Sequence, residues 1–398
     1  MSLSWIDLGL SIGALPVLAA SVYLAALAVL ARRGLTPVPP APCLKFDVVV
    51  PAHNEEAGIS RTIESLRVLN YPRELFRVLV VADNCCDRTA ERAKAAGARV
   101  LVRHEPERRG KGYALAHAFD HSLAEEFADA VVVVDADTVV SSNLLSAFAA
   151  RFARGAAAVQ ADYGVRNPDS SWRTRLLTIA LAAFHGVRSL ARERLGLSCG
   201  FRGNGMGVAT TVLRAVPYRV FSIVEDIQYG LELAYAGYRV QYVPEARVLG
   251  EMATTERASR SQRRRWERGR LALARQHVPR LLARAWRRKD RLLLDLALDL
   301  MVPPVAQLLA MNVTGCMLCL LALGLGRGVG LAPWLWGASL CGLLLYTVRG
   351  WTLSGVGPRG LLDLFWSPVY VLWKLTLRFR RKQQGDDEWI RTTRETRM

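Results

Sequence analysis

The sequence predicts an α/β domain, Rossmann-like and cytoplasmic, that is flanked by transmembrane and interfacial helices. Three valine-rich runs, each ending in polar residues, alternate with stretches of helical pattern. Such βαβ patterning places the carboxyl ends of parallel strands at one edge of a sheet, where open α/β folds bind nucleotides. Apolar segments long enough to cross a bilayer lie on both sides of this region.

The amino-terminal segment Ile6 to Leu30 is almost wholly apolar and about 25 residues long, which suffices for a membrane span. A cleaved signal peptide is the alternative, but the residues before this segment carry no positive charge. The basic pair Arg32 and Arg33 follows it, so the positive-inside rule puts the amino terminus outside and the chain from Pro37 in the cytoplasm. We expect a transmembrane helix in 1–35 and a catalytic domain in 36–285.

The expected strands begin the segments FDVVVPAHNEEAGI (Phe46 to Ile59), FRVLVVADNCCDRTA (Phe76 to Ala90) and VVVVDADTVV (Val131 to Val140). Helical stretches Glu56 to Leu69 and Asp87 to Ala96 separate them. Polar residues therefore converge on one crevice at the carboxyl ends of the strands.

The third strand ends in Asp135 and Asp137, which supply hard oxygen ligands at the sheet edge. An Asp-x-Asp pair also caps helices or remains solvated, so it is weak evidence by itself. Together with the other strand ends, it predicts a site for a phosphate bound to Mg²⁺ or Mn²⁺.

A cationic, glycine-rich loop, Arg108 to Gly112, precedes the helical stretch Tyr113 to Glu126. Glycines around Lys111 at a helix start suit a diphosphate, although a solvated basic turn has the same composition.

Two further constellations lie closer to the carboxyl terminus. Glu225 and Asp226 open a helix over Val224 to Tyr238, where acidic residues also serve as helix caps. In a helix, Gln262, Arg265 and Trp266 share one face, so an amide, a guanidinium and an aromatic ring point the same way.

The carboxyl-terminal third is again apolar, and we expect interfacial and transmembrane helices in 286–378 and a basic cytoplasmic tail in 379–398. Candidate spans are Leu300 to Leu323 and Leu331 to Val348. Leu361 to Leu377 is short, contains Pro368 and precedes a basic cluster, which favours a re-entrant or interfacial helix. Arg291 to Leu300, with Asp295 and Asp299 on one face, also has an interfacial pattern.

The formal net charge of +18 is concentrated in arginines between Arg257 and Arg291. No recognition-helix or aromatic-sheet pattern accompanies it, so we expect anionic membrane lipids and not nucleic acid as its partner. The seven cysteines predict neither disulfides nor a structural metal site.

Taken in order, Asp83, Asp135 and Asp137, Glu225-Asp226 and the Gln262 to Trp266 element resemble the membrane-bound family 2 glycosyltransferases. This group contains cellulose, chitin and hyaluronan synthases. The resemblance covers Phe46 to Arg270 and implies a GT-A fold, a nucleotide-sugar donor such as a UDP-sugar, a divalent cation, and inversion at the anomeric carbon.

The resemblance also implies roles for single residues. Asp226 is the base and, with an ordinary low pKa, would be ionised at pH 7. Asp83 is matched to the nucleobase contact, and Trp266 would stack on an acceptor sugar. The remaining matches are Pro51, Asn54 and Glu55 with the donor, Lys111 and Arg265 with the diphosphate, and Glu225 and Gln262 with acceptor or diphosphate. The loop Ser198 to Gly207, with Gly203 and Asn204, resembles the family's acceptor loop before a helix.

Two departures from the family pattern limit the expectation of a secreted polymer. The chain has few apolar spans, and its acidic motif begins with Val224 where cellulose synthases have threonine. We therefore expect sugar transfer to a lipid-linked or polysaccharide acceptor for the cell envelope, at the inner membrane, with a processive synthase as the alternative. A sugar nucleotidyltransferase would have a glycine-rich loop after the first strand, where this chain has the turn PAHNEE. A component that only binds nucleotide would need no base, so the presence of Asp226 disfavours that alternative.

Overall fold

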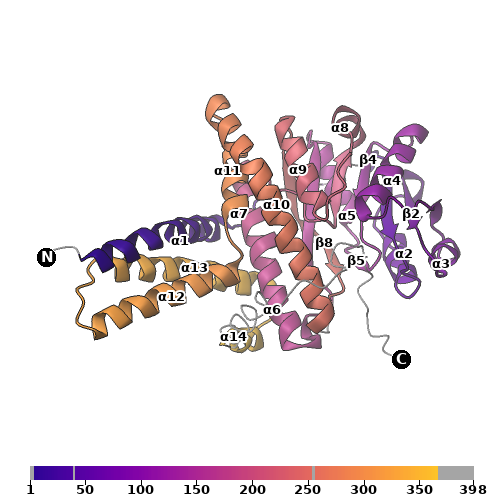
Figure 1. The fold of residues 1–398 in the computed structure, drawn as a ribbon. Helices are drawn as coiled ribbons and strands as arrows, with labels where there is room; N and C mark the ends of the chain where they lie inside the picture. Colours follow the sequence, from indigo (N-terminus) through magenta and orange to yellow (C-terminus); the bar gives the residue numbers. More distant parts are fainter. Residues whose placement is uncertain (1–3, 39–40, 253–255, 366–398) are drawn as a thin grey trace.

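The computed structural model describes residues 4–38, 41–252 and 256–365, and their side chains apart from 256–265 and 365. A mixed eight-stranded sheet in the order β3-β2-β1-β4-β7-β6-β8-β5 forms its centre (Figure 1). The strands are β1 (Phe46–Ala52), β2 (Phe76–Asp83), β3 (Arg99–Arg103), β4 (Ala130–Val133), β5 (Thr138–Val140), β6 (Ala158–Val165), β7 (Met206–Ala209) and β8 (Val240–Gly250).

The helices of the α/β domain flank this sheet. They are α2 (Ile59–Arg67), α3 (Thr89–Ala95), α4 (Lys111–Glu125), α5 (Leu144–Phe152), α6 (Trp172–Leu181), α7 (Arg188–Arg194), α8 (Thr210–Ala215) and α9 (Glu225–Tyr235), with short turns η1 (Arg73–Leu75) and η2 (Pro168–Ser170) and the π-helix η3 (Ala182–Val187). The remaining helices are α1 (Trp5–Leu30), α10 (Glu256–Arg288), α11 (Arg291–Met301), α12 (Val305–Gly324), α13 (Ala332–Ser354) and α14 (Pro358–Phe365).

The three expected strands are confirmed as β1, β2 and the first part of the valine run, β4. They pair in parallel, β1 with β2 and β1 with β4. Their valines are buried on both faces because helices cover both: Val49 and Val131 pack in one core with α4, and Val48 and Val132 in the other with α2 and α5.

The sheet is not purely parallel, which the βαβ pattern did not indicate. Strand β7 runs antiparallel between β4 and β6, whereas β6 and β8 are parallel. The second half of the valine run leaves β4 and forms β5, which pairs antiparallel with β8. This break turns the chain at Asp135 to Asp137 and brings β8 beside the strand-end crevice.

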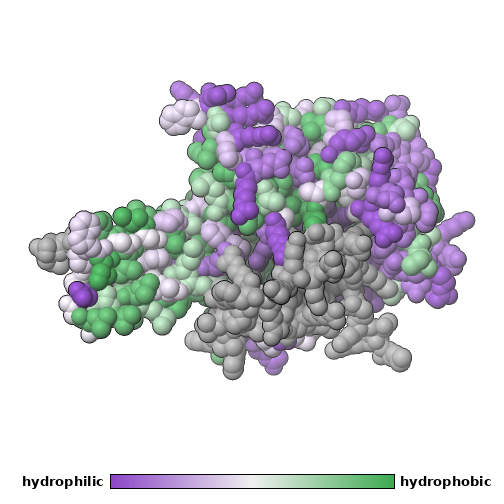
Figure 2. Space-filling model, viewed as in Figure 1, coloured by the Kyte–Doolittle hydropathy of each residue, from purple (hydrophilic) through white to green (hydrophobic). Residues whose placement is uncertain are grey.

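A bundle of α1, α12 and α13 projects from the α/β domain (Figure 1). Within the described residues, α1 and α12 are long and apolar enough to cross a membrane, by length and composition alone. The expected span Leu331 to Val348 forms the less apolar helix α13. Figure 2 shows hydrophobic residues on the surface of this bundle, and Leu320 of α12 is 68% exposed.

Asp7 joins the start of α1 to the start of α13. Its carboxylate accepts hydrogen bonds from the backbone N–H groups of Gly330 at 2.9 Å and Ala332 at 3.0 Å, at the start of α13. The carboxylate thereby satisfies amides that the helix itself leaves without partners.

The polar face of helix α11 is buried, whereas the polar face of the expected interfacial helix would contact water. Asp295 and Asp299 are buried and form ion pairs with Arg192 at 2.8 Å and Arg188 at 2.7 Å, both from α7. The polar face of α11 therefore contacts protein. Most of Leu361 to Leu377, and all of 379–398, lie outside the described residues.

Candidate active site

The turn after β4 holds the two carboxylates of the Asp-x-Asp motif, both partly exposed. Lys111, the first residue of α4, places Nζ 2.5 Å from Asp135 Oδ1 and donates to the Gly203 carbonyl. Burial lowers the pKa of Lys111, but the negative charges of Asp135 and Glu225 outweigh it and the net shift is upward. Lys111 is therefore a fixed cation beside the Asp-x-Asp turn.

The loop 198–205 crosses the same crevice. Gly203 has φ +81°, a conformation that favours glycine, and a Cβ on it would crowd Asp226 Oδ2 at 3.3 Å. The buried Asn204 accepts from the Asp135 N–H at 3.1 Å and donates to Thr138 Oγ1 at 2.7 Å. The short strand β7 begins at Met206, within the loop predicted over Ser198 to Gly207, and the expected helix follows it as α8 from Thr210.

Helix α9 begins with Glu225 and Asp226 at the other wall of the crevice. Glu225 is buried, with Oε1 4.0 Å from Lys111 Nζ. Burial raises the pKa of both carboxyl groups, more than Lys111 lowers it. The expectation of an ordinary low pKa for Asp226 is therefore wrong: loss of hydration at the crevice wall makes its charged form more costly.

The turn after β1 faces the end of β2. Pro51 is buried within β1, and Asn54, with φ +55°, accepts from the Cys86 N–H at 2.8 Å. The Glu55 N–H donates to Thr89 Oγ1 at 2.8 Å. These bonds hold the turn in a single geometry at the strand-end edge.

Asp83 ends β2 and is fully buried, with Oδ1 2.5 Å from the Arg103 guanidinium. Arg103 itself was not predicted as a site residue; it is the last residue of the strand RVLVR, Arg99 to Arg103. Asp83 and Arg103 are register partners of β2 and β3, a pairing that no local pattern reveals.

Helix α10 passes the start of α9. A Cβ on Gly269 would lie 2.8 Å from Val224 Cγ1, so this glycine allows the two elements to meet. Trp266, one turn earlier, is 37% exposed. The side chains of Gln262 and Arg265 lie outside the described residues.

Two more residues of this region were missed by the sequence patterns. Tyr163 of β6 lies near the carboxylates of Asp135 and Asp137, whose charges raise its pKa in addition to burial. Arg202 precedes Gly203 and is 9% exposed. Both come from strand or loop segments that the valine pattern did not include.

The described residues contain no cluster of three or more His, Cys, Asp or Glu that could hold a metal ion. Asp135 and Asp137 are a pair of hard oxygen donors in an accessible turn, which suits a cation that takes its other ligands from phosphates and water, as Mg²⁺ does.

The model of the family described as "Glycosyltransferase like family 2" matches residues 42–269, more than half of the chain and the whole strand-end crevice. The chain belongs to this family. This family 2 glycosyltransferase has a GT-A fold, as the resemblance of its sequence motifs implied. Over 93% of its length it superimposes on 98% of the mannosyltransferase PcManGT from Pyrobaculum calidifontis, solved in complex with GDP-Man and Mn²⁺, with a TM-score of 0.55 and 19% identity.

Curated relatives resemble the same region. The chain is 25% identical over 232 residues to the probable glycosyltransferase YdaM of Bacillus subtilis, covering 56% of this chain and 55% of YdaM. It is 30% identical over 231 residues to the beta-monoglucosyldiacylglycerol synthase of Synechocystis, covering 56% and 47%. The match thus spans about half the length of these relatives.

Proposed function

We propose that this family 2 glycosyltransferase moves a sugar from a nucleoside diphosphate sugar, such as a UDP-sugar, to a lipid-linked or polysaccharide acceptor with inversion. The observation that supports this most is the convergence of Asp135, Lys111 and Asp226 around Gly203. It brings a cation suited to phosphate and a carboxylate suited to act as a base to the same glycine of one loop.

A divalent cation, Mg²⁺ or Mn²⁺, would be held by Asp135 and Asp137. When bound, it would neutralise charge on the leaving diphosphate. The pair fits such an ion because both side chains are partly exposed at a turn and the donor itself supplies phosphate oxygens.

Lys111 orients the leaving group. Its ammonium is fixed by Asp135 and the Gly203 carbonyl, so it is preorganised where negative charge develops as the glycosidic phosphate bond breaks. Arg265 would add a second cation. Asp83 and the turn with Pro51, Asn54 and Glu55 would hold the nucleoside.

Asp226 would remove the proton from the acceptor hydroxyl as its oxygen attacks the anomeric carbon on the face opposite the diphosphate. Burial of this carboxyl group supports that role, because a raised pKa makes a carboxylate a stronger base. Glu225 and Asn204 would keep the crevice wall in place, and Trp266 would stack on an acceptor sugar.

We propose that the reaction occurs at the inner membrane, with the α/β domain in the cytoplasm. The exposed apolar surface of the projecting bundle supports a membrane location. The name of one relative, a beta-monoglucosyldiacylglycerol synthase, supports a lipid acceptor.

The test is a donor screen on membranes that contain the protein, with labelled nucleotide sugars, followed by mass analysis of the lipid extract. We expect one donor to yield a labelled lipid or glycan, and Asp226→Asn to abolish it. Asp120→Asn is the matched control, because Asp120 lies on the surface in a pair with Arg219 that is more than half exposed. Formation of a new sugar nucleotide in place of a glycoside would contradict the proposal.

A further inference from the structure

A fully buried amide side chain lies next to the loop 198–205. It belongs to Gln160 of β6, whose strand neighbours Ala158 and Ala161 are buried and apolar. Loss of hydration makes a buried amide unfavourable unless its oxygen and its N–H groups find hydrogen-bond partners. The partners of Gln160 therefore indicate what this amide does in the fold.

Gln160 bonds to the loop on both sides of Gly203. Its Oε1 accepts from the Arg202 N–H at 2.9 Å, and its Nε2 donates to the Asn204 carbonyl at 2.7 Å. The same Nε2 also donates to the carbonyl of Ala161 in its own strand, at 3.0 Å. One side chain thus ties the peptide groups before and after Gly203 to the central sheet.

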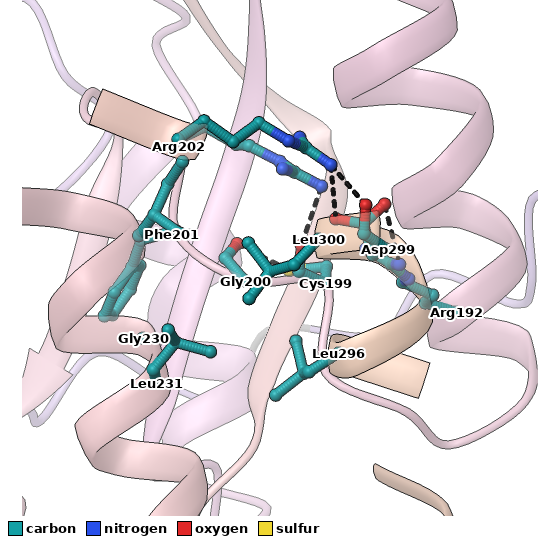
Figure 3. Close-up of a pocket in the computed structure, with 12 residues that line it drawn as sticks. Arg192, Cys199, Gly200, Phe201, Arg202, Gly230, Leu231, Leu296, Asp299 and Leu300 are labelled. Atoms are coloured by element: carbon teal, nitrogen blue, oxygen red, sulfur yellow. Dashed lines mark hydrogen bonds and ion pairs between the residues drawn. The ribbon is translucent and has the colours of Figure 1, made fainter. Parts of the chain in front are cut away.

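The loop requires such contacts because its backbone is unusually free. Gly200, Gly203 and Gly205 all have positive φ, at +69°, +81° and +68°. Glycine loses more conformational freedom on ordering than other residues, so a single loop geometry has to be held by other parts of the protein. The first half of the loop lies beside Asp299 and Leu300 of α11 (Figure 3). Gln160 supplies the contact around Gly203.

The position of Gly203 affects both groups to which the proposed reaction assigns a role. Its carbonyl accepts from Lys111, which is also paired with Asp135. A Cβ on Gly203 would lie only 3.3 Å from Asp226 Oδ2, so the glycine backbone packs against that carboxylate. A shift of this backbone would therefore change the separation of Lys111 and Asp226. Misplacement of catalytic groups by about 1 Å can slow a reaction by about two orders of magnitude.

We propose that Gln160 is a positioning residue for sugar transfer. It fixes the peptide groups around Gly203, and through them the placement of Lys111 on the leaving-group side relative to Asp226 on the acceptor side. This inference rests on the proposed function, which assigns those roles to Lys111 and Asp226. Because Gln160 is fully buried, it acts through the loop and not by contact with a substrate.

The test compares variants of the full chain in neutral detergent. Gln160→Met has a side chain of similar size without an amide, so it removes both bonds to the loop. Gln160→Glu keeps an acceptor for the Arg202 N–H but replaces the N–H donor, and it serves as the second variant if methionine prevents folding. Asn143→Leu is the matched control. The Asn143 amide accepts from Ser141 Oγ at 2.7 Å and donates to the Glu245 carbonyl at 2.9 Å, so it joins the start of α5 to β8 by the same two kinds of bond.

Amide hydrogen exchange, measured by mass spectrometry on the peptide that contains the loop, shows whether Gln160 holds it. This measurement requires no activity. We expect exchange in the loop to be at least about tenfold faster in Gln160→Met than in the wild type, because two hydrogen bonds are lost. Gln160→Glu should also accelerate exchange in the loop, whereas Asn143→Leu should leave it unchanged.

Transfer kinetics, with the donor that the screen identifies, show the consequence for the reaction. We expect Gln160→Met to lower kcat by about tenfold or more while the donor KM stays within about threefold. The physical reason is that the two groups on either side of Gly203 lose their alignment, whereas the expected nucleoside contacts at Asp83 remain. A residue that served stability alone would leave kcat per folded molecule unchanged.

Four results would overturn the inference. Unchanged loop exchange in a folded Gln160 variant means that this amide does not hold the loop. Faster loop exchange with normal kcat means that the loop position does not limit the reaction. An equal loss of kcat in Asn143→Leu means that the effect is not specific to Gln160. Loss of folding in both Gln160 variants assigns the amide to stability alone. If the wild type transfers sugar from no donor, the proposed function fails, and loop exchange still decides separately whether Gln160 holds the loop.

Discussion

Arg103 holds the Asp83 carboxylate from the neighbouring strand, with 2.5 Å between the guanidinium and Oδ1. Asp83 is fully buried and Arg103 is 6% exposed. Asp83 Oδ2 has no hydrogen-bond partner within the described residues. The ion pair thus orients a buried carboxylate at the strand-end edge and uses only one of its two oxygens.

We expect Arg103→Gln to destabilise the protein by about 3–5 kcal/mol, because it leaves a buried carboxylate without its counter-ion. Thermal unfolding in detergent measures the loss. Arg88→Gln is the control, since Arg88 pairs with Glu56 at 3.6 Å on the surface and such pairs contribute about 0–1 kcal/mol. Equal melting temperatures for the two variants would show that the Asp83 pair contributes no more than a surface pair.

Excess chelator should abolish sugar transfer, and Mg²⁺ or Mn²⁺ should restore it, because Asp135 and Asp137 would hold the cation on the diphosphate. Asp137→Ala should be inactive at any metal concentration while its melting temperature stays near that of the wild type. Transfer rates over a metal titration measure both. Full activity in chelator would exclude a metal role for the turn.

Asp226→Asn should reduce turnover by about two orders of magnitude or more, while donor affinity changes little, because a base acts on the acceptor proton. Asp137→Ala should weaken metal-dependent donor binding as well. Donor titrations and single-turnover rates separate the two. If Asp226→Asn turns over normally, Glu225 becomes the candidate base.

As the pH is lowered, kcat/KM should fall at a pH above 3.8, which is the ordinary pKa of aspartate. Burial raises the pKa of Asp226, and only its deprotonated form is a base, so activity falls as pH decreases through that raised pKa. Lys111 opposes the shift, and Lys111→Met should move the acid limb to still higher pH. Lys94→Met, which changes a surface lysine of α3, should leave the limb in place.

Native thiols test the proposed topology. Cys43 and Cys86 are exposed in the α/β domain, so a membrane-impermeant thiol reagent should label them only after the inner membrane is opened. Cys341 of α13 is also exposed, so a variant with both Cys43→Ser and Cys341→Ser is needed to leave Cys86 as the exposed thiol. Reaction of Cys86 in intact spheroplasts would place the domain outside.

Sequence patterns predicted the parts of this site that depend on residues close together in the sequence. Runs such as Val131 to Val134 are apolar because both sheet faces are covered, and the polar turn after them follows from the same pattern. The order of the later strands could not be predicted, because β6 and β8 depend on contacts distant in sequence.

The cluster of buried arginines around Asp299 could not be predicted from the sequence for the same reason. Arg202 and Arg270 resemble any arginine in a basic chain, and only the packing of α10 and α11 near the loop 198–205 makes them neighbours of Asp299. Likewise, the sequence of α11 has the pattern of an interfacial amphipathic helix. The arginines that pair with Asp295 and Asp299 lie on α7, so the sequence of α11 alone does not show that its acidic face is buried.

The bond from Asp7 to the start of α13 has a consequence for synthesis. Its three partners, Gly330, Leu331 and Ala332, lie 323 to 325 residues further along the chain. At about 5–20 residues per second, they leave the ribosome roughly 15–65 seconds after Asp7. The α/β strands are all made in that interval, so the catalytic domain can fold before the bundle closes. A newly made chain would then complete its strand-end crevice first and the bundle of α1, α12 and α13 last.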